Sequence, residues 1–124
     1  MENRFLGKSG LEVSVFGFGC MTFSDGTGRF GATGSTNCAD AARQIDLCID
    51  HGINFFDTAD VYSAGRSEEI LGEALGKRRK QVVVATKAFH RMGKGTHDAG
   101  LSRRHLIDAC EASLRRLGTD WIDL

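Results

Sequence analysis

The chain has 124 residues, of which 41% are hydrophobic, as in a globular protein rather than a disordered chain. Sixteen basic residues balance sixteen acidic ones, so no net charge favours nucleic acid or an anionic membrane as a partner. No apolar stretch reaches the length of a signal peptide core or a membrane span. We therefore expect one domain or part of one, located in the cytoplasm.

The first elements in chain order are a hairpin and a strand. Residues 4–6 and 12–14 flank a glycine-containing turn at residues 7–10, a pattern that predicts a β-hairpin. Residues 15–18, Val-Phe-Gly-Phe, predict a first buried strand. A glycine-rich loop then runs from Gly19 to about Thr36, a length typical of functional loops.

The next unit is a helix followed by a strand. Thr36 or Asn37 can cap a helix that ends at His51 and Gly52, where a glycine suits the C-terminal position. Apolar residues recur at helical spacing along this segment: Ala41, Ile45, Cys48 and Ile49. The apolar run at residues 53–56 then predicts a second strand.

Two further units repeat the pattern. Ser67 can cap a helix over residues 68–75, with Glu68 and Glu69 near the positive end of its dipole, before a strand at residues 82–86. Ser102 can cap a third helix that Gly118 ends, and residues 121–124 then begin another strand. Alternating strands and helices with short connections predict an α/β fold with a parallel sheet.

Three ionisable residues follow the predicted strands. Asp57 comes directly after one strand, Tyr62 lies five residues further on, and Lys87 follows the next strand. Alone, each has an ordinary interpretation: a loop cap, an amphipathic surface aromatic and a strand-end lysine. Parallel strands place their carboxyl ends on one edge, however, where the sites of such folds gather. An acid, a phenol and an amine at one edge suit the reduction of a carbonyl group, with the phenol as proton donor.

Other motifs have weaker support. The segment Gly26–Gly31 matches the dinucleotide fingerprint G-x-G-x-x-G, but it directly follows no strand and directly precedes no helix. The basic run Lys77–Lys80 follows a helix C-terminus and is more typical of solvated charge than of a phosphate or nucleic-acid site. The four cysteines lack the spacing of a zinc site, so we expect no metal, and reduced thiols fit the cytoplasm. His90, in the loop after Lys87, is a weaker candidate for the same site.

Four sequence segments together resemble the aldo-keto reductase superfamily. They are Gly52–Tyr62, Ser67–Gly72, Val84–Lys87 and Ser113–Leu124, and the similarity covers nearly the whole chain. Within the superfamily, residues 19–23 and the loop Asp60–Ser63 resemble bacterial oxidoreductases related to potassium-channel β subunits.

The resemblance implies a (β/α)8 TIM barrel with a hairpin closing its bottom. It implies that Tyr62 is the general acid, that Lys87 strengthens it as an acid, and that Asp57 pairs with Lys87. NADPH would supply the hydride to a small carbonyl substrate. The residues near its nicotinamide and ribose would be Gly19, Cys20, Met21 and Asp57.

A whole barrel of this kind needs about 250 residues. We therefore expect residues 1–124 to form one partial barrel domain, the N-terminal half, cut at the fourth strand, with the family's catalytic histidine beyond Leu124. Three functions stay open: a reductase of an aldehyde or ketone, a nucleotide-binding regulatory module like the channel β subunits, and an inert fragment that pairs with a second copy.

Overall fold

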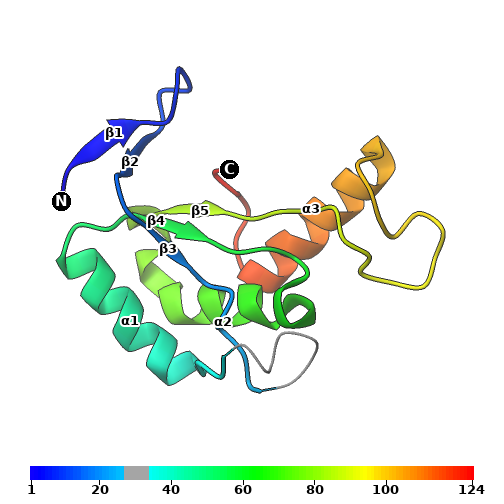
Figure 1. Cartoon of the computed structure of the whole chain (residues 1–124), viewed down its shortest axis with the longest axis horizontal. Helices are drawn as coiled ribbons and strands as arrows, with labels where there is room; N and C mark the ends of the chain where they lie inside the picture. The colour runs from blue at the N-terminus through cyan, green and yellow to red at the C-terminus, as the bar shows by residue number, and fades with distance from the viewer. Residues whose placement is uncertain (27–33) are drawn as a thin grey trace.

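The computed structural model describes residues 1–26 and 34–124, so most of the candidate fingerprint Gly26–Gly31 lies outside the described residues. Strands and helices alternate along the chain after an N-terminal hairpin, which confirms the α/β class (Figure 1). None of the described helices is long and apolar enough to cross a membrane.

The predicted hairpin is present. Strands β1 (Asn3–Phe5) and β2 (Glu12–Ser14) pair antiparallel, with Arg4 opposite Val13. Asn54, just before strand β4, attaches the hairpin to the sheet: its side-chain oxygen accepts from the Ser14 amide at 2.7 Å, and its own amide donates to Ser14 Oγ at 3.1 Å. The hairpin therefore lies at the amino end of the strands, away from the carboxyl ends where the site was predicted.

Three parallel strands form the central sheet in chain order: β3 (Gly17–Gly19), β4 (Phe55–Asp57) and β5 (Val83–Ala85). Gly19, Asp57 and Ala85 lie side by side at their carboxyl ends. The first of these strands differs from the prediction, because it begins two residues later and is not buried. In the described sheet β3 is an edge strand with one neighbour, which leaves Phe18 half-buried and the preceding Phe16 66% exposed.

The expected strand at residues 121–124 is not formed as one. The amides of Asp123 and Leu124 both approach the carbonyl oxygen of Val84, at 3.2 and 3.3 Å, and the Thr86 amide donates to Leu124 at 3.0 Å. Two amides that share one acceptor do not follow the regular spacing of a parallel ladder. The segment nevertheless runs beside β5, as Figure 1 shows for the C-terminus.

Local signals position two of the three α-helices found in the described residues. Helix α1 (Cys38–Asp50) begins after Asn37, whose side chain accepts from the Asp40 amide at 3.0 Å, so Asn37 rather than Thr36 is the cap. Helix α3 (Arg103–Leu117) begins after Ser102, whose hydroxyl accepts from the His105 amide at 3.1 Å. It ends at Gly118, which has the left-handed conformation (φ 63°) that glycine adopts easily.

Helix α2 (Arg66–Leu75) starts differently from the prediction. Its N-cap is Gly65, at the end of the 3₁₀ helix η2 (Tyr62–Gly65), and not Ser67. The buried Ser67 hydroxyl instead donates to the Cys20 carbonyl at 2.7 Å and lies 2.9 Å from Thr58 Oγ1. The side chain of Ser67 thus makes a tertiary contact instead of capping the helix, the role that the local sequence predicts. The predicted end of this helix at Gly76 is confirmed.

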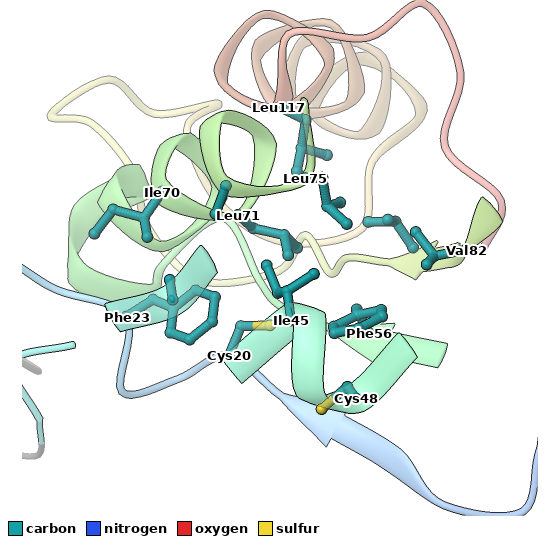
Figure 2. Close-up of a cluster of buried hydrophobic side chains, with 13 residues drawn as sticks. Cys20, Phe23, Ile45, Cys48, Phe56, Ile70, Leu71, Leu75, Val82 and Leu117 are labelled. Atoms are coloured by element: carbon teal, nitrogen blue, oxygen red, sulfur yellow. The ribbon is translucent and has the colours of Figure 1, made fainter. Parts of the chain in front are cut away.

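The hydrophobic core lies between the sheet and helices α1 and α2. In Figure 2, Ile45 of α1, Phe56 of β4 and Leu71 of α2 meet in this cluster, and all three are fully buried. Phe56 reaches the core because alternate residues of a strand point to opposite faces. Its neighbours Phe55 and Asp57 therefore face the side of the sheet away from these helices.

The basic run within the 3₁₀ helix η3 (Gly76–Gln81) is only partly solvated, contrary to the prediction. Arg79 is 8% exposed and lies over the Trp121 ring, 4.4 Å from its centroid. Its guanidinium donates to the carbonyl oxygens of Val82 and Trp121 and pairs with Asp123 at 2.8 Å. This side chain ties the last described residues to the end of η3.

Candidate active site

Backbone hydrogen bonds continue beyond the carboxyl ends of the strands. The Cys20 amide donates to the Asp57 carbonyl at 2.8 Å, and the Asp60 amide donates to the Lys87 carbonyl at 3.1 Å. These hydrogen bonds hold the loops that carry the predicted site residues side by side, in the same order as the strands they follow. The loops therefore have fixed positions at the carboxyl edge of the sheet.

Asp57 and Lys87 meet on one face of the sheet. Asp57 pairs with Ala85 in the ladder, and Lys87 lies two residues beyond Ala85, so both side chains point the same way. Lys87 Nζ lies 2.8 Å from Asp57 Oδ1 and 2.7 Å from Oδ2, and it also donates to the Thr58 carbonyl at 2.8 Å. The side chains are 38% and 51% exposed, so the pair is accessible to a ligand.

Tyr62 completes the cluster. Lys87 Nζ lies 5.2 Å from the centroid of the Tyr62 ring, within the range of a cation–π contact. The residues after Tyr62 have an unusual backbone: Ser63 and Ala64 have φ values of 49° and 55°, a region that non-glycine residues rarely adopt. Such strain is often found at functional sites, and here it fixes the turn that follows the phenol. The structure thus brings all three predicted catalytic residues together.

A small pocket of about 170 Å³ opens beside this cluster. Tyr62, Lys87, Phe89 and His90 line it, together with the loop that precedes Tyr62. His90 was the weaker candidate, and it does face the predicted site. Phe89 was missed, although a large apolar side chain directly after the Lys87 strand, here 55% exposed, is a signal that could have found it. An aromatic wall beside a phenol and an ammonium suits a small substrate with an apolar part and one polar atom.

The predicted cofactor residues differ in what they expose. Gly19 is exposed with open space above its backbone, and Met21 is 40% exposed, both next to Asp57 at the strand ends. Cys20 has no exposed surface, and burial first, then the negative charge of Asp57, raises the pKa of its thiol. The backbone of Gly19 is bare and has open space above it, so a flat ring could approach it closely. The thiol of Cys20 faces the core instead.

A buried ion pair supports the strand end before Lys87. Glu68 is fully buried, accepts from Thr86 Oγ1 at 2.6 Å and pairs with Arg116 Nε at 2.6 Å. The sequence predicted only that Glu68 lies near the helix dipole, because both of its partners come from distant parts of the chain. The pair fixes Thr86, the residue before Lys87, to helices α2 and α3.

Within the described residues, no group of three or more histidine, cysteine, aspartate or glutamate side chains is arranged to hold a metal ion. The groups that meet in the predicted site are the phenol of Tyr62, the ammonium of Lys87 and the carboxylate of Asp57. These three groups can together donate a proton and stabilise the charge left behind.

The chain is similar to curated proteins and to solved structures. The chain is 43% and 41% identical, over its whole length, to proteins from Arabidopsis thaliana and Oryza sativa subsp. japonica named "Probable voltage-gated potassium channel subunit beta". The holo form of an aldo-keto reductase from Bacillus halodurans superposes on 98% of the chain with a TM-score of 0.80 and 38% sequence identity.

These relatives are longer than the chain. It spans 36% of the length of each plant protein and 38% of the Bacillus halodurans protein. The model of the family described as "Aldo/keto reductase family" matches residues 16–124, which include both strands and both loops of the site. The chain therefore belongs to the aldo/keto reductase family.

Proposed function

We propose that the chain carries the proton-donating part of an NADPH-dependent oxidoreductase that reduces an aldehyde or ketone to an alcohol. One observation carries this proposal: Lys87 Nζ contacts both carboxylate oxygens of Asp57 and lies over the ring of Tyr62. Family membership gives the oxidoreductase class, and the geometry supports the assignment of roles.

In this proposal Tyr62 donates its phenolic proton to the carbonyl oxygen of the substrate. The Lys87 ammonium stabilises the negative charge that develops on the phenol oxygen as the proton leaves. Asp57 holds that ammonium in place through both of its carboxylate oxygens. Phe89 and His90 border the substrate, and the carbonyl points toward Tyr62.

NADPH, when bound, supplies the hydride that reaches the carbonyl carbon. Exposed Gly19 and Met21 and the carboxylate of Asp57 would hold its nicotinamide and ribose. Cys20 would lie beneath the cofactor, and its buried thiol would not contact it. The Bacillus halodurans relative is described as a holo form, which supports a bound cofactor in proteins of this family.

The same proposal includes the barrel. Two strand–helix–strand units with parallel strands in chain order suit the N-terminal half of a (β/α)8 TIM barrel, and residues 1–124 would form one partial domain. We also propose a cytoplasmic location, because all four cysteines are free thiols.

A second candidate is a regulatory module that binds the nucleotide without fast turnover. The names of the two plant relatives favour it, because both refer to a channel subunit rather than to an enzyme. A third is self-association of two copies through the edge strand β3, beside which Phe16 is 66% exposed. A stable monomer by light scattering would exclude this pairing.

Titration of NADPH into the 124-residue chain, followed by nicotinamide fluorescence, tests the proposal together with an aldehyde assay. Saturable binding with NADPH oxidation upon addition of an aldehyde supports the reductase. Saturable binding without oxidation supports the regulatory module. Absence of binding contradicts both, and the family membership would then describe ancestry alone.

A further inference from the structure

A second cavity lies between helix α3 and residues 92–98. It has a volume of about 210 Å³, and Asp60, Met92, His105, Ala109, Ala112 and Arg116 contribute to its lining. Asp60 also borders the pocket beside Tyr62, but the other five residues take no part in the proposed reduction. The cavity therefore adjoins the candidate active site at Asp60, but the rest of its lining is its own.

Asp60 is the most unusual residue of this cavity. It is 1% exposed, and its Oδ2 atom has no hydrogen-bond partner. Burial raises the pKa of its carboxyl, and the nearby carboxylate of Glu68 raises it further, while the Val61 amide lowers it through a hydrogen bond. A buried carboxylate oxygen without a partner is costly, so the free lone pairs of Oδ2 favour a ligand.

The charges around Asp60 do not cancel. Asp60 and Glu68 are two buried acids, and Arg116 is the guanidinium beside them. That guanidinium is bound elsewhere, because its Nε donates to Glu68 Oε2 at 2.6 Å and its terminal nitrogen to Ser113 Oγ at 3.2 Å. The charges of Arg116 and His105 lower the pKa of the Asp60 carboxyl, but less than burial and Glu68 raise it. Among the described residues, Arg116 forms its ion pair with Glu68, and Asp60 has no ion-pair partner of its own.

His105 presents a second atom without a partner to the same cavity. His105 lies in the first turn of α3 and is 4% exposed, and its Nε2 atom lacks a hydrogen bond. A neutral imidazole with its proton on Nδ1 offers Nε2 as an acceptor. A ligand that donates two hydrogen bonds from one charged atom would satisfy both His105 and Asp60.

We propose that this cavity binds the primary ammonium group of a small organic amine. One N–H donates to Asp60 Oδ2 and another to His105 Nε2, and the alkyl part packs against Met92, Ala109 and Ala112. Two further carboxylates make the lining acidic: Asp108, whose nearest cation is Arg104 at 4.0 Å, and Asp98, which accepts from the Gly95 amide at 2.7 Å.

The chemistry of the site favours an organic cation over its competitors. A metal ion would need more ligands than the region offers, since no group of three or more potential ligands is arranged for one among the residues described. An alcohol carries only one hydroxyl donor and leaves the charge of Asp60 uncompensated. A water molecule could satisfy both atoms but would add no charge, and the experiment separates this case.

Three probes of similar size test the proposal on the 124-residue chain by ligand-observed NMR and calorimetry at constant ionic strength. n-Butylammonium chloride should bind saturably, in the millimolar range expected for a ligand of so few atoms. 1-Butanol, which lacks the charge, and tetramethylammonium chloride, which lacks N–H donors, should bind about tenfold more weakly or not at all. Equal binding of butanol, or no binding of butylammonium, would overturn the proposal in favour of an apolar or water-filled cavity.

Two matched variants locate the charge that is required. Asp60→Asn should weaken butylammonium binding about tenfold or more, whereas Asp108→Asn, which removes an exposed carboxylate of the same cavity, should weaken it only slightly. Equal losses in both variants would mean a diffuse acidic surface and contradict the site. If Asp60→Asn does not fold, the site can be located in the unmodified chain by NMR. The methyl resonances of Ala109 and Ala112 should then shift when butylammonium is added, and the absence of a shift would overturn the proposal.

Discussion

The ammonium of Lys87 lies 2.7 and 2.8 Å from the two carboxylate oxygens of Asp57, thirty residues earlier in the chain. The same nitrogen is 5.2 Å from the centre of the Tyr62 ring. The parallel strands β4 and β5 create this relationship, because they deliver both side chains to one face at their carboxyl ends. The proposed chemistry depends on this one contact more than on any other.

Replacement of Lys87 by methionine should remove activity and leave the fold. We expect turnover to fall by about 10²–10⁴, the contribution typical of assisted proton transfer, because the charge on the Tyr62 oxygen loses its stabilising cation. The side chain is 51% exposed, so the free energy of unfolding should change by about 1 kcal/mol or less. NADPH oxidation and urea denaturation measure the two effects. Lys80→Met, an exposed lysine in η3, is the control, and wild-type turnover in Lys87→Met would refute the role.

Removal of Glu68 should destabilise the chain. Glu68→Ala leaves Arg116 without its partner and frees Thr86, and breaking a buried ion pair costs about 3–5 kcal/mol. Glu69→Ala, one residue further along α2, removes an exposed carboxylate that pairs with Arg66 and should cost about 1 kcal/mol or less. Urea denaturation compares the two variants. Equal losses of stability would show that the buried ion pair contributes no more to the free energy of unfolding than the exposed one.

Asp60 should make stability depend on pH. The ordinary carboxyl pKa of 3.8 applies to the unfolded chain, and burial raises the pKa of Asp60 in the folded state. Between these two values the folded chain binds more protons than the unfolded chain, so this residue lowers stability as pH rises through that window. Asp60→Asn should therefore gain stability relative to the wild type from acid toward neutral pH, and the gain should level off above the folded-state pKa.

Urea denaturation of the wild type and of Asp60→Asn at a series of pH values measures this gain. Asp108→Asn is the control, because its carboxylate is exposed and it should show a much smaller trend. A constant difference between Asp60→Asn and the wild type, or a difference that shrinks as pH rises, would contradict the burial argument.

Gly72→Ala should destabilise although alanine favours helices. In an exposed helix this change stabilises by about 1 kcal/mol. Here the added methyl carbon would collide with the carbonyl group of Leu117 and would lie 2.9 Å from its Cα atom. Helices α2 and α3 must therefore separate. We expect a loss of about 1–3 kcal/mol, as for overpacking, in a thermal or urea denaturation experiment. A more stable variant would show that the contact between the helices adapts freely.

Local signals predicted much of the fold. Asn37, Ser102 and Gly118 mark helix ends through hydrogen bonds or backbone conformations that involve only neighbouring residues. The gathering of Asp57, Tyr62 and Lys87 followed from parallel topology, which places strand ends on one edge. Both kinds of inference depend on spacing that is visible in the sequence.

Features set by distant contacts could not be predicted in this way. Ser67 is not a cap, because its hydroxyl bonds to the carbonyl of Cys20, 47 residues earlier. Glu68 finds Arg116 across 48 residues, and Asp60 and His105 meet a common cavity only after α3 has packed. The segment at 121–124 has a strand-like sequence, yet the Val84 amide of β5 donates to the side chain of Asp123, which also pairs with Arg79, 44 residues earlier.

The role of Tyr62 as proton donor is tested by NADPH oxidation in the presence of an aldehyde, measured for the chain and for its Tyr62→Phe variant, which lacks only the phenolic oxygen. The wild type should form alcohol in step with NADPH consumption. Tyr62→Phe should bind NADPH equally well but turn over about 10²-fold or more slowly. Equal turnover by the two proteins would contradict Tyr62 as the proton donor.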